Sequence, residues 1–73
     1  MEPSFNQLGN RLKYFRKLKG YSNYERFAYE INISRTQYGK YEAGGNIKFS
    51  TLLKILKQLE VPLKEFFQEG FDD

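Results

Sequence analysis

Four polar side chains that lie close together in the sequence could recognise nucleic acid. They are Arg35, Thr36, Gln37 and Lys40. An arginine guanidinium can donate two parallel hydrogen bonds to the O6 and N7 atoms of one guanine, and a threonine methyl can contact the methyl group of thymine. On one helix, these residues would form a short, polar and positively charged face. Such a face suits hydrogen bonding to base edges.

The residues around this group predict two short helices that would hold it in place. Apolar side chains recur at helical spacing on both sides of a short break. They are Phe27, Ala28 and Ile31 before the break, and Tyr38 and Tyr41 after it. In the break, Asn32 suits a turn position with positive φ, Ile33 can pin the two helices together, and Ser34 can cap the second. A polar helix face held on a partner helix is typical of a helix-turn-helix DNA reader.

Helix-ending residues along the chain predict three further helices. Gly20 is a natural end for the first helix, Gly44 ends the third, and Pro62 separates the last two. Ser50 is expected to cap the fourth helix. The expected ranges are 6–19, 24–31, 35–43, 50–59 and 63–68. Because no strand pattern appears, the sequence predicts an all-α fold.

Two positions have alternative interpretations. Ser22 could cap the second helix through a capping box with Glu25, whereas Asn23 would start that helix one residue later. Gly39 lies inside the third helix, where glycine costs roughly 1 kcal/mol relative to alanine. We therefore expect a close approach to backbone at Gly39, with a simply tolerated glycine as the alternative.

The apolar positions predict a single core. Its expected members are Leu12, Phe15, Phe27, Ala28, Ile31, Ile33, Tyr41, Leu52, Leu53, Leu56 and Phe66. The residues expected on the outer surface of the first helix are Arg11, Lys13, Arg16 and Lys17. Phe66 and Phe67 could close the core or offer apolar surface for association, and both readings also stand for Phe71.

The composition limits the classes of function. The 73 residues, 1–73, form one domain, since so short a chain cannot support two cores. The absence of cysteine and histidine excludes disulfides and the usual zinc sites, and we expect no metal, no cofactor and no enzymatic activity. No apolar run approaches the ~20 residues of a membrane span, and the N-terminus lacks a signal-peptide pattern. We expect a cytoplasmic protein with no membrane partner.

The charge is divided along the chain. Residues 1–57 carry eleven of the twelve lysines and arginines against four glutamates, a net charge of +7. Residues 58–73 carry one lysine against five acidic residues, a net charge of −4, and end in an acidic tail at 69–73. A soluble surface with a solvated tail explains this division. A basic body that faces polyanions explains it equally well.

From Leu8 to Phe67 the sequence resembles the phage-repressor and Cro helix-turn-helix family, which is also called Xre-like. The resemblance is carried by LGNRLKYFRKLKG, FAYEINISRTQYGKYEAG and TLLKILKQLEVPLKEFF. It implies a compact five-helix bundle of the lambda-repressor-like DNA-binding type, with a central helix-turn-helix at 24–43. Tyr38 departs from the family pattern, because a small aliphatic residue is usual at that position.

The resemblance also implies roles for individual residues. The implied base contacts are Arg35, Thr36, Gln37 and Lys40. The implied phosphate contacts are Asn23, Tyr24, Asn46 and Lys48. Arg16 and Glu42 match a structural ion pair that ties the first helix to the end of the recognition helix.

Three functions remain open at this point. The first is a sequence-specific regulator of transcription that binds double-stranded DNA, as a homodimer on an inverted repeat. The second is an antitoxin-like interaction module that binds a protein partner through its acidic, aromatic C-terminal end and binds DNA secondarily. The third is a single-stranded nucleic-acid binder that stacks bases on Tyr14, Tyr24 or Tyr29. The helical spacing of most aromatic residues favours the core, and therefore the first reading.

Overall fold

The computed structural model describes residues 4–71, and five α-helices account for most of them. They are α1 (Phe5–Leu18), α2 (Tyr24–Glu30), α3 (Arg35–Glu42), α4 (Phe49–Leu59) and α5 (Leu63–Phe66). No strand occurs within 4–71, so the all-α, five-helix prediction is confirmed. Of the acidic tail at 69–73, positions 72 and 73 lie outside the described residues.

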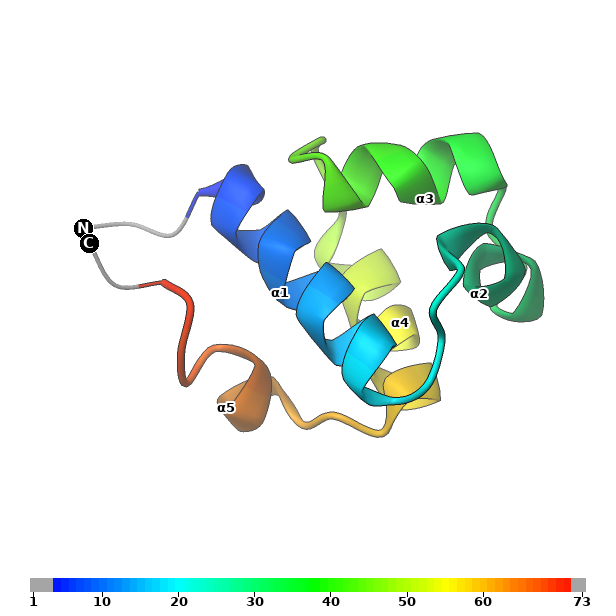
Figure 1. Cartoon of the computed structure of the whole chain (residues 1–73). Helices are drawn as coiled ribbons and strands as arrows, with labels where there is room; N and C mark the ends of the chain where they lie inside the picture. The colour runs from blue at the N-terminus through cyan, green and yellow to red at the C-terminus, as the bar shows by residue number, and fades with distance from the viewer. Residues whose placement is uncertain (1–3, 72–73) are drawn as a thin grey trace.

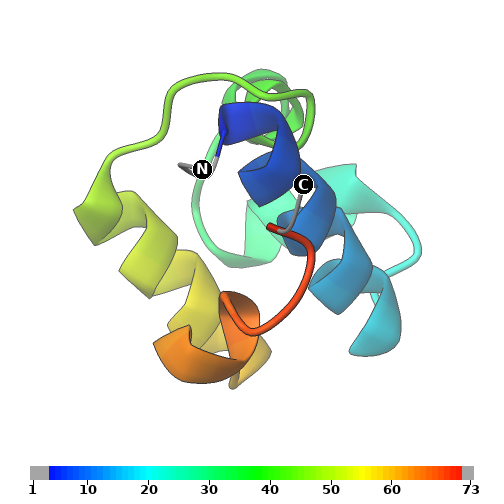
Figure 2. The ribbon, with the colours of Figure 1, turned by 90° about the vertical axis from the view of Figure 1, so that its left-hand side faces the viewer.

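The helices form one bundle with α3 on its surface. In Figure 1 and Figure 2, α3 lies along the upper edge, and α5 lies near the lower edge, at the opposite end of the bundle. The start of α3 adjoins α2, and its end adjoins the first half of α1. Within residues 4–71, no helix combines the length and apolar character needed to cross a membrane.

The side chains that cap the helices resolve one open question and correct one prediction. The Asn23 side-chain oxygen accepts hydrogen bonds from the backbone N–H groups of Glu25 and Arg26, so Asn23, and not Ser22, caps α2. The prediction that Ser50 caps α4 is wrong. That helix begins at Phe49, after an extended Lys48 that makes no side-chain cap hydrogen bond. The buried apolar face of α4, and not a cap, therefore supports its first turn.

The core is close to the predicted one but differs in α4. The buried apolar residues are Leu12, Phe15, Phe27, Ala28, Ile31, Tyr38, Tyr41, Ile47, Leu52, Ile55, Leu56, Leu59, Val61 and Phe66. The prediction of Leu53 was wrong, because that side chain is 41% exposed at the edge of the α4 apolar face. Ile33 is only partly buried. The inward face of α4 follows the i, i+3, i+4, i+7 spacing of a helix stripe, which excludes residue 53.

Arg11 is buried, which contradicts the expectation that it covers the outer surface of α1. Its Nε donates a hydrogen bond of 3.1 Å to the carbonyl oxygen of Phe66, and a second nitrogen donates one of 3.3 Å to that of Glu65. The guanidinium also lies over the rings of Tyr14 and Phe15. Arg11 therefore links α1 to the end of α5.

Gly9 permits the closest contact between α1 and α3. A Cβ atom at this position would lie 2.6 Å from the carbonyl oxygens of both Tyr41 and Glu42. Both atoms belong to the backbone, so neither can turn aside as a flexible side chain could. Glycine is therefore required where α1 crosses the end of α3.

Candidate nucleic-acid interface

The turn between α2 and α3 has the predicted local geometry. Asn32 adopts a φ of 61°, in the left-handed region that asparagine tolerates better than most residues. The next backbone N–H, of Ile33, donates to the carbonyl oxygen of Ala28 at 3.0 Å. The Ser34 hydroxyl then accepts a hydrogen bond from the N–H of Gln37 and caps α3. These contacts set the direction in which α3 leaves α2.

The helix α3 exposes all four of the residues predicted to contact bases. Arg35, Thr36, Gln37 and Lys40 are exposed, whereas Tyr38 and Tyr41 are buried. With 3.6 residues per turn, Thr36 and Lys40 lie on the side opposite the two tyrosines, and Arg35 and Gln37 lie at its two edges. We call this set of four exposed residues the α3 face.

Aromatic rings support the α3 face from below. Tyr38 is fully buried, and its ring centroid lies 5.3 Å from that of Phe27 on α2 and 6.5 Å from that of Tyr41. The rings of Tyr38 and Tyr24 are 6.3 Å apart. A large aromatic side chain thus occupies the position where the resembled family usually has a small aliphatic one.

The Tyr38 hydroxyl is an unusual feature of this support. It is buried and lies near Glu42 and Arg16, but it makes no hydrogen bond of ordinary geometry with any described residue. Burial raises the pKa of Tyr38 far above its usual range, and the charge of Glu42 raises that pKa further, while Arg16 opposes the shift. The phenol is therefore neutral at every ordinary pH.

A buried ion pair joins the end of α3 to α1. Arg16 Nε lies 2.7 Å from Glu42 Oε2, and the Arg16 side chain is only 3% exposed. The two terminal nitrogens of the same guanidinium also donate hydrogen bonds. One donates to the backbone carbonyl oxygen of Tyr21, and the other donates to Glu42 Oε1. Arg16 was expected both on the outer surface and in this pair, and the structure corrects the first expectation. Because its charge is engaged inside the fold, Arg16 is not available to a phosphate.

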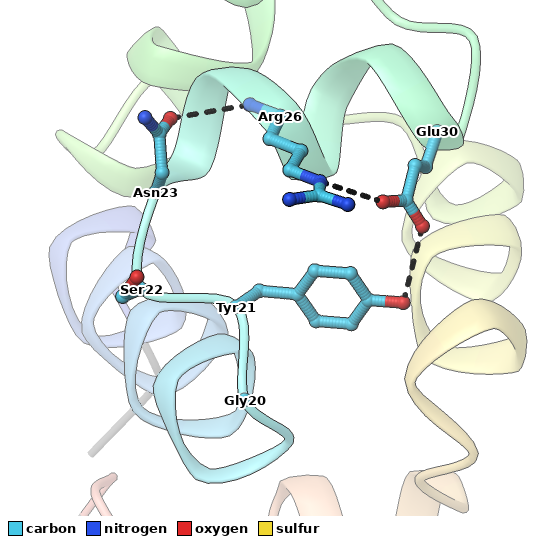
Figure 3. Close-up of a pocket in the computed structure, with 6 residues that line it drawn as sticks. All are labelled: Gly20, Tyr21, Ser22, Asn23, Arg26 and Glu30. Carbon is cyan, nitrogen blue, oxygen red and sulfur yellow. Dashed lines mark hydrogen bonds and ion pairs between the residues drawn. The ribbon is translucent and has the colours of Figure 1, made fainter.

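A polar pocket of about 430 Å³ lies beside the start of α2. Figure 3 shows Tyr21 and Arg26 directed toward Glu30, at 3.3 Å and 3.5 Å from its carboxylate oxygens. The Asn23 oxygen faces the α2 backbone, where it caps the helix. Because that oxygen already accepts hydrogen bonds from the α2 backbone, the group of the Asn23 side chain that could bind a phosphate is its amide NH₂, which is a hydrogen-bond donor.

The segment after α3 exposes the second pair of residues predicted to contact phosphates. Asn46 and Lys48 are exposed, while Ile47 between them is buried in the core. The N–H of Gly45 donates a 2.7 Å hydrogen bond to the carbonyl oxygen of Lys40, which folds this segment back on the end of α3. The prediction of the core missed Ile47, although an apolar residue between two polar ones was a signal that could have found it.

Gly39 lies close to another residue, but not to the kind of atom that the sequence suggested. The expected neighbour was backbone. The nearest atoms to a Cβ placed there all belong to the Tyr24 ring, the first of them at 3.1 Å. The ring reaches α3 because Tyr24 is the first residue of α2, whose start lies across the middle of α3.

Among residues 4–71, no cluster of acidic side chains has the arrangement that a metal ion would need.

The chain is similar to known proteins over most of its length. A family model described as helix-turn-helix matches residues 12–66. A control protein, C.MunI of a Mycoplasma species, is 38% identical over 64 residues, which cover 86% of each chain. No solved structure matches the chain significantly.

Proposed function

Because the chain belongs to the helix-turn-helix family of DNA-binding proteins, we propose that it regulates transcription by reading double-stranded DNA with α3 in the major groove. The observation that carries this proposal is the exposed, polar and basic α3 face on a rigid aromatic support. An α-helix fits the width of the major groove, where each base pair presents a distinct pattern of donors and acceptors. The similarity to a control protein supports the same class of function.

Base recognition is assigned to the α3 face. Arg35 is the first residue of α3 and is exposed, so its guanidinium can extend into the groove and bind one guanine with two hydrogen bonds. Thr36 can contact a thymine methyl group. Lys40 and Gln37, on the next turn and at the edge of the face, can donate to neighbouring acceptors.

Phosphate binding is assigned to residues on both sides of α3. Asn23 and Tyr24 lie at the start of α2, and Asn46 and Lys48 lie in the segment that follows α3. Contacts to the sugar-phosphate backbone position a protein on the duplex without reading its sequence. Two such groups, before and after the reading helix, would hold α3 in one register.

We further propose that the protein binds an inverted repeat as a homodimer. Exposed apolar side chains occur on α4, on α5 and directly after α5, namely Phe49, Leu53, Leu63 and Phe67. Phe66 is not available for association because it lies in the core, and Phe71 is partly buried against that core. Contact between two copies through α4 and α5 would leave both α3 faces free for DNA. Two half-sites would then lie about one helical turn apart.

Selection from random duplex DNA with the purified chain tests the proposal, with Arg35→Ala as the test variant and Lys17→Ala as the control. An inverted-repeat consensus is expected. Arg35→Ala should lose about 1–3 kcal/mol of binding free energy on that site and relax discrimination at one base pair of each half-site. Lys17→Ala changes an exposed charge on α1 and should keep the parent consensus.

Two results would count against the proposal. Identical selections for the parent and Arg35→Ala would remove Arg35 from base readout. Failure of the parent to enrich any duplex would instead favour the interaction module, in which a protein partner binds the C-terminal end. The melting temperature of Arg35→Ala should match that of the parent, because the exposed side chain makes no contact that supports the fold.

A further inference from the structure

We infer that Gly39 leaves the space that the Tyr24 ring occupies on α3, and thereby determines how α3 is positioned on DNA. This inference rests on the proposed function and extends it to a residue on which no contact with DNA was predicted. In this arrangement, Tyr24 belongs to α2 by sequence but lies against α3. Gly39 is a positioning residue that acts through the Tyr24 hydroxyl.

The space above Gly39 is filled by the ring of Tyr24. A Cβ atom at position 39 would lie 3.1 Å from Tyr24 Cε1, 3.3 Å from its hydroxyl oxygen and 3.4 Å from Cζ. The first two distances are shorter than an ordinary van der Waals contact between heavy atoms. Any side chain at position 39 would therefore press on the outer half of the ring, which carries the hydroxyl.

A second residue of α3 also supports the ring. The Tyr24 and Tyr38 rings are 6.3 Å apart, and Tyr38 is itself packed against Phe27 in the core. Tyr24 is 38% exposed, so part of the ring remains at the surface. Packed against Gly39 and Tyr38, two neighbouring residues of α3, the ring has little freedom to choose another rotamer without losing contacts.

Gly39 and the Tyr24 ring that covers it lie next to the α3 face. Gly39 follows Arg35 by four residues, and residues at this spacing are neighbours on the surface of a helix. The Tyr24 hydroxyl therefore lies one turn beyond the side chain assigned to base recognition. A phenol hydroxyl can donate a hydrogen bond to a phosphate oxygen. A donor held at that distance from Arg35 would set where α3 lies relative to the DNA backbone.

A glycine in the middle of a reading helix is otherwise unfavourable. Glycine is less favourable than alanine inside a helix, and the φ of Gly39 does not lie in the left-handed region. Gly39 is not needed for the backbone conformation of α3. The close Tyr24 ring supplies the reason for a residue without a side chain.

A double-mutant cycle on a duplex that carries the selected site tests the inference. Gly39→Ala should weaken binding about tenfold in the parent and change the preferred base at the pair read by Arg35. In a Tyr24→Ala background, where no ring remains to be displaced, the same substitution should change affinity less than about twofold. Equal losses in both backgrounds would mean that DNA itself needs the glycine, and would overturn the inference.

Tyr24→Phe provides a second measurement that does not disturb packing. It keeps the ring over Gly39 and removes only the hydroxyl, so the melting temperature should be unchanged. Affinity should fall about tenfold on the selected duplex and by a similar factor on a scrambled one, because a phosphate contact carries no sequence information. Unchanged affinity on both duplexes would exclude the hydroxyl contact.

Arg35→Ala on the same two duplexes separates the two proposals. If Arg35→Ala loses specific binding and the Tyr24 and Gly39 variants do not, the inference fails while the proposed function stands. If the parent binds neither duplex, the proposed function itself fails.

Discussion

The helix α3 is held in different ways by its two neighbours. On the α1 side, Gly9 abuts backbone carbonyl oxygens, and the ion pair of Arg16 with Glu42 is buried. On the α2 side, the supporting atoms belong to the aromatic rings of Tyr24 and Phe27, which pack against Tyr38 of α3. Backbone atoms and buried charges cannot adjust to a substitution, whereas a partly exposed ring can be displaced at the cost of its contacts. The α1 side therefore determines whether α3 is in place, and the α2 side can adjust how α3 is presented.

The largest expected effect tests the ion pair on the α1 side. Glu42→Ala leaves the Arg16 guanidinium buried without its carboxylate partner. Removal of one partner of a buried pair costs about 3–5 kcal/mol, so the free energy of unfolding should fall by that amount. Denaturant unfolding measures it, and Glu69→Ala, which removes an exposed carboxylate, should leave the midpoint unchanged. A loss below about 1 kcal/mol would show that the pair is worth no more than an exposed one.

A smaller effect is expected from the glycine on the same side. Alanine is normally preferred over glycine inside a helix by roughly 1 kcal/mol. Gly9→Ala should nevertheless destabilise the fold by about 1–3 kcal/mol, because its Cβ would overlap two backbone oxygens. Thermal unfolding of Gly9→Ala and of Gly39→Ala is the measurement. The added methyl group meets backbone oxygens in the first variant and the Tyr24 ring in the second. A larger loss for Gly39→Ala would reverse the comparison between the two sides.

The smallest effect concerns Tyr38 and depends on pH. An unfolded tyrosine loses its proton near pH 10.0, whereas burial keeps the folded Tyr38 neutral well above that value. Above pH 10.0 the unfolded state therefore binds fewer protons than the folded state, and the free energy of unfolding falls by about 1.4 kcal/mol per pH unit. At neutral pH this term is absent, and Tyr38→Phe should be close to neutral, since the hydroxyl makes no hydrogen bond of ordinary geometry.

The measurement is denaturant unfolding at about pH 7 and about pH 11. Near pH 11, Tyr38→Phe should be more stable than the parent by about 1.4 kcal/mol. Tyr29→Phe is the matched control, because Tyr29 is 85% exposed and its substitution should preserve the alkaline loss. An equal alkaline loss in parent and Tyr38→Phe would mean that the buried phenol ionises as it does in the unfolded chain.

Local features were predictable from the sequence because they depend on neighbouring residues alone. The positive φ of Asn32, the Ser34 cap and the exposed α3 face all follow from residues within a few positions of each other. The contacts of that face with DNA stay a prediction. The sequence also marked Gly39 as unusual, although it could not identify the Tyr24 ring as its neighbour.

Two features that depend on the packing of the whole fold were missed. Leu53 was placed in the core because α4 has more apolar residues than one inward face can hold. Arg11 looked like any other charge on an amphipathic helix, since nothing near it in the sequence indicates a partner. Its acceptors, the carbonyl oxygens of Glu65 and Phe66, are 54 and 55 residues away. Only the packed fold brings them together.

The link from Arg11 to α5 also has a consequence for how the protein is made. On a ribosome, the acceptors for Arg11 are synthesised 54 and 55 residues after it. At about 5–20 residues per second, this delay is roughly 3–11 seconds. The helix-turn-helix segment at 24–43 is translated within that interval, while the guanidinium of Arg11 still needs water as its partner. The first helix can therefore reach its native packing only after the last helix has left the exit tunnel.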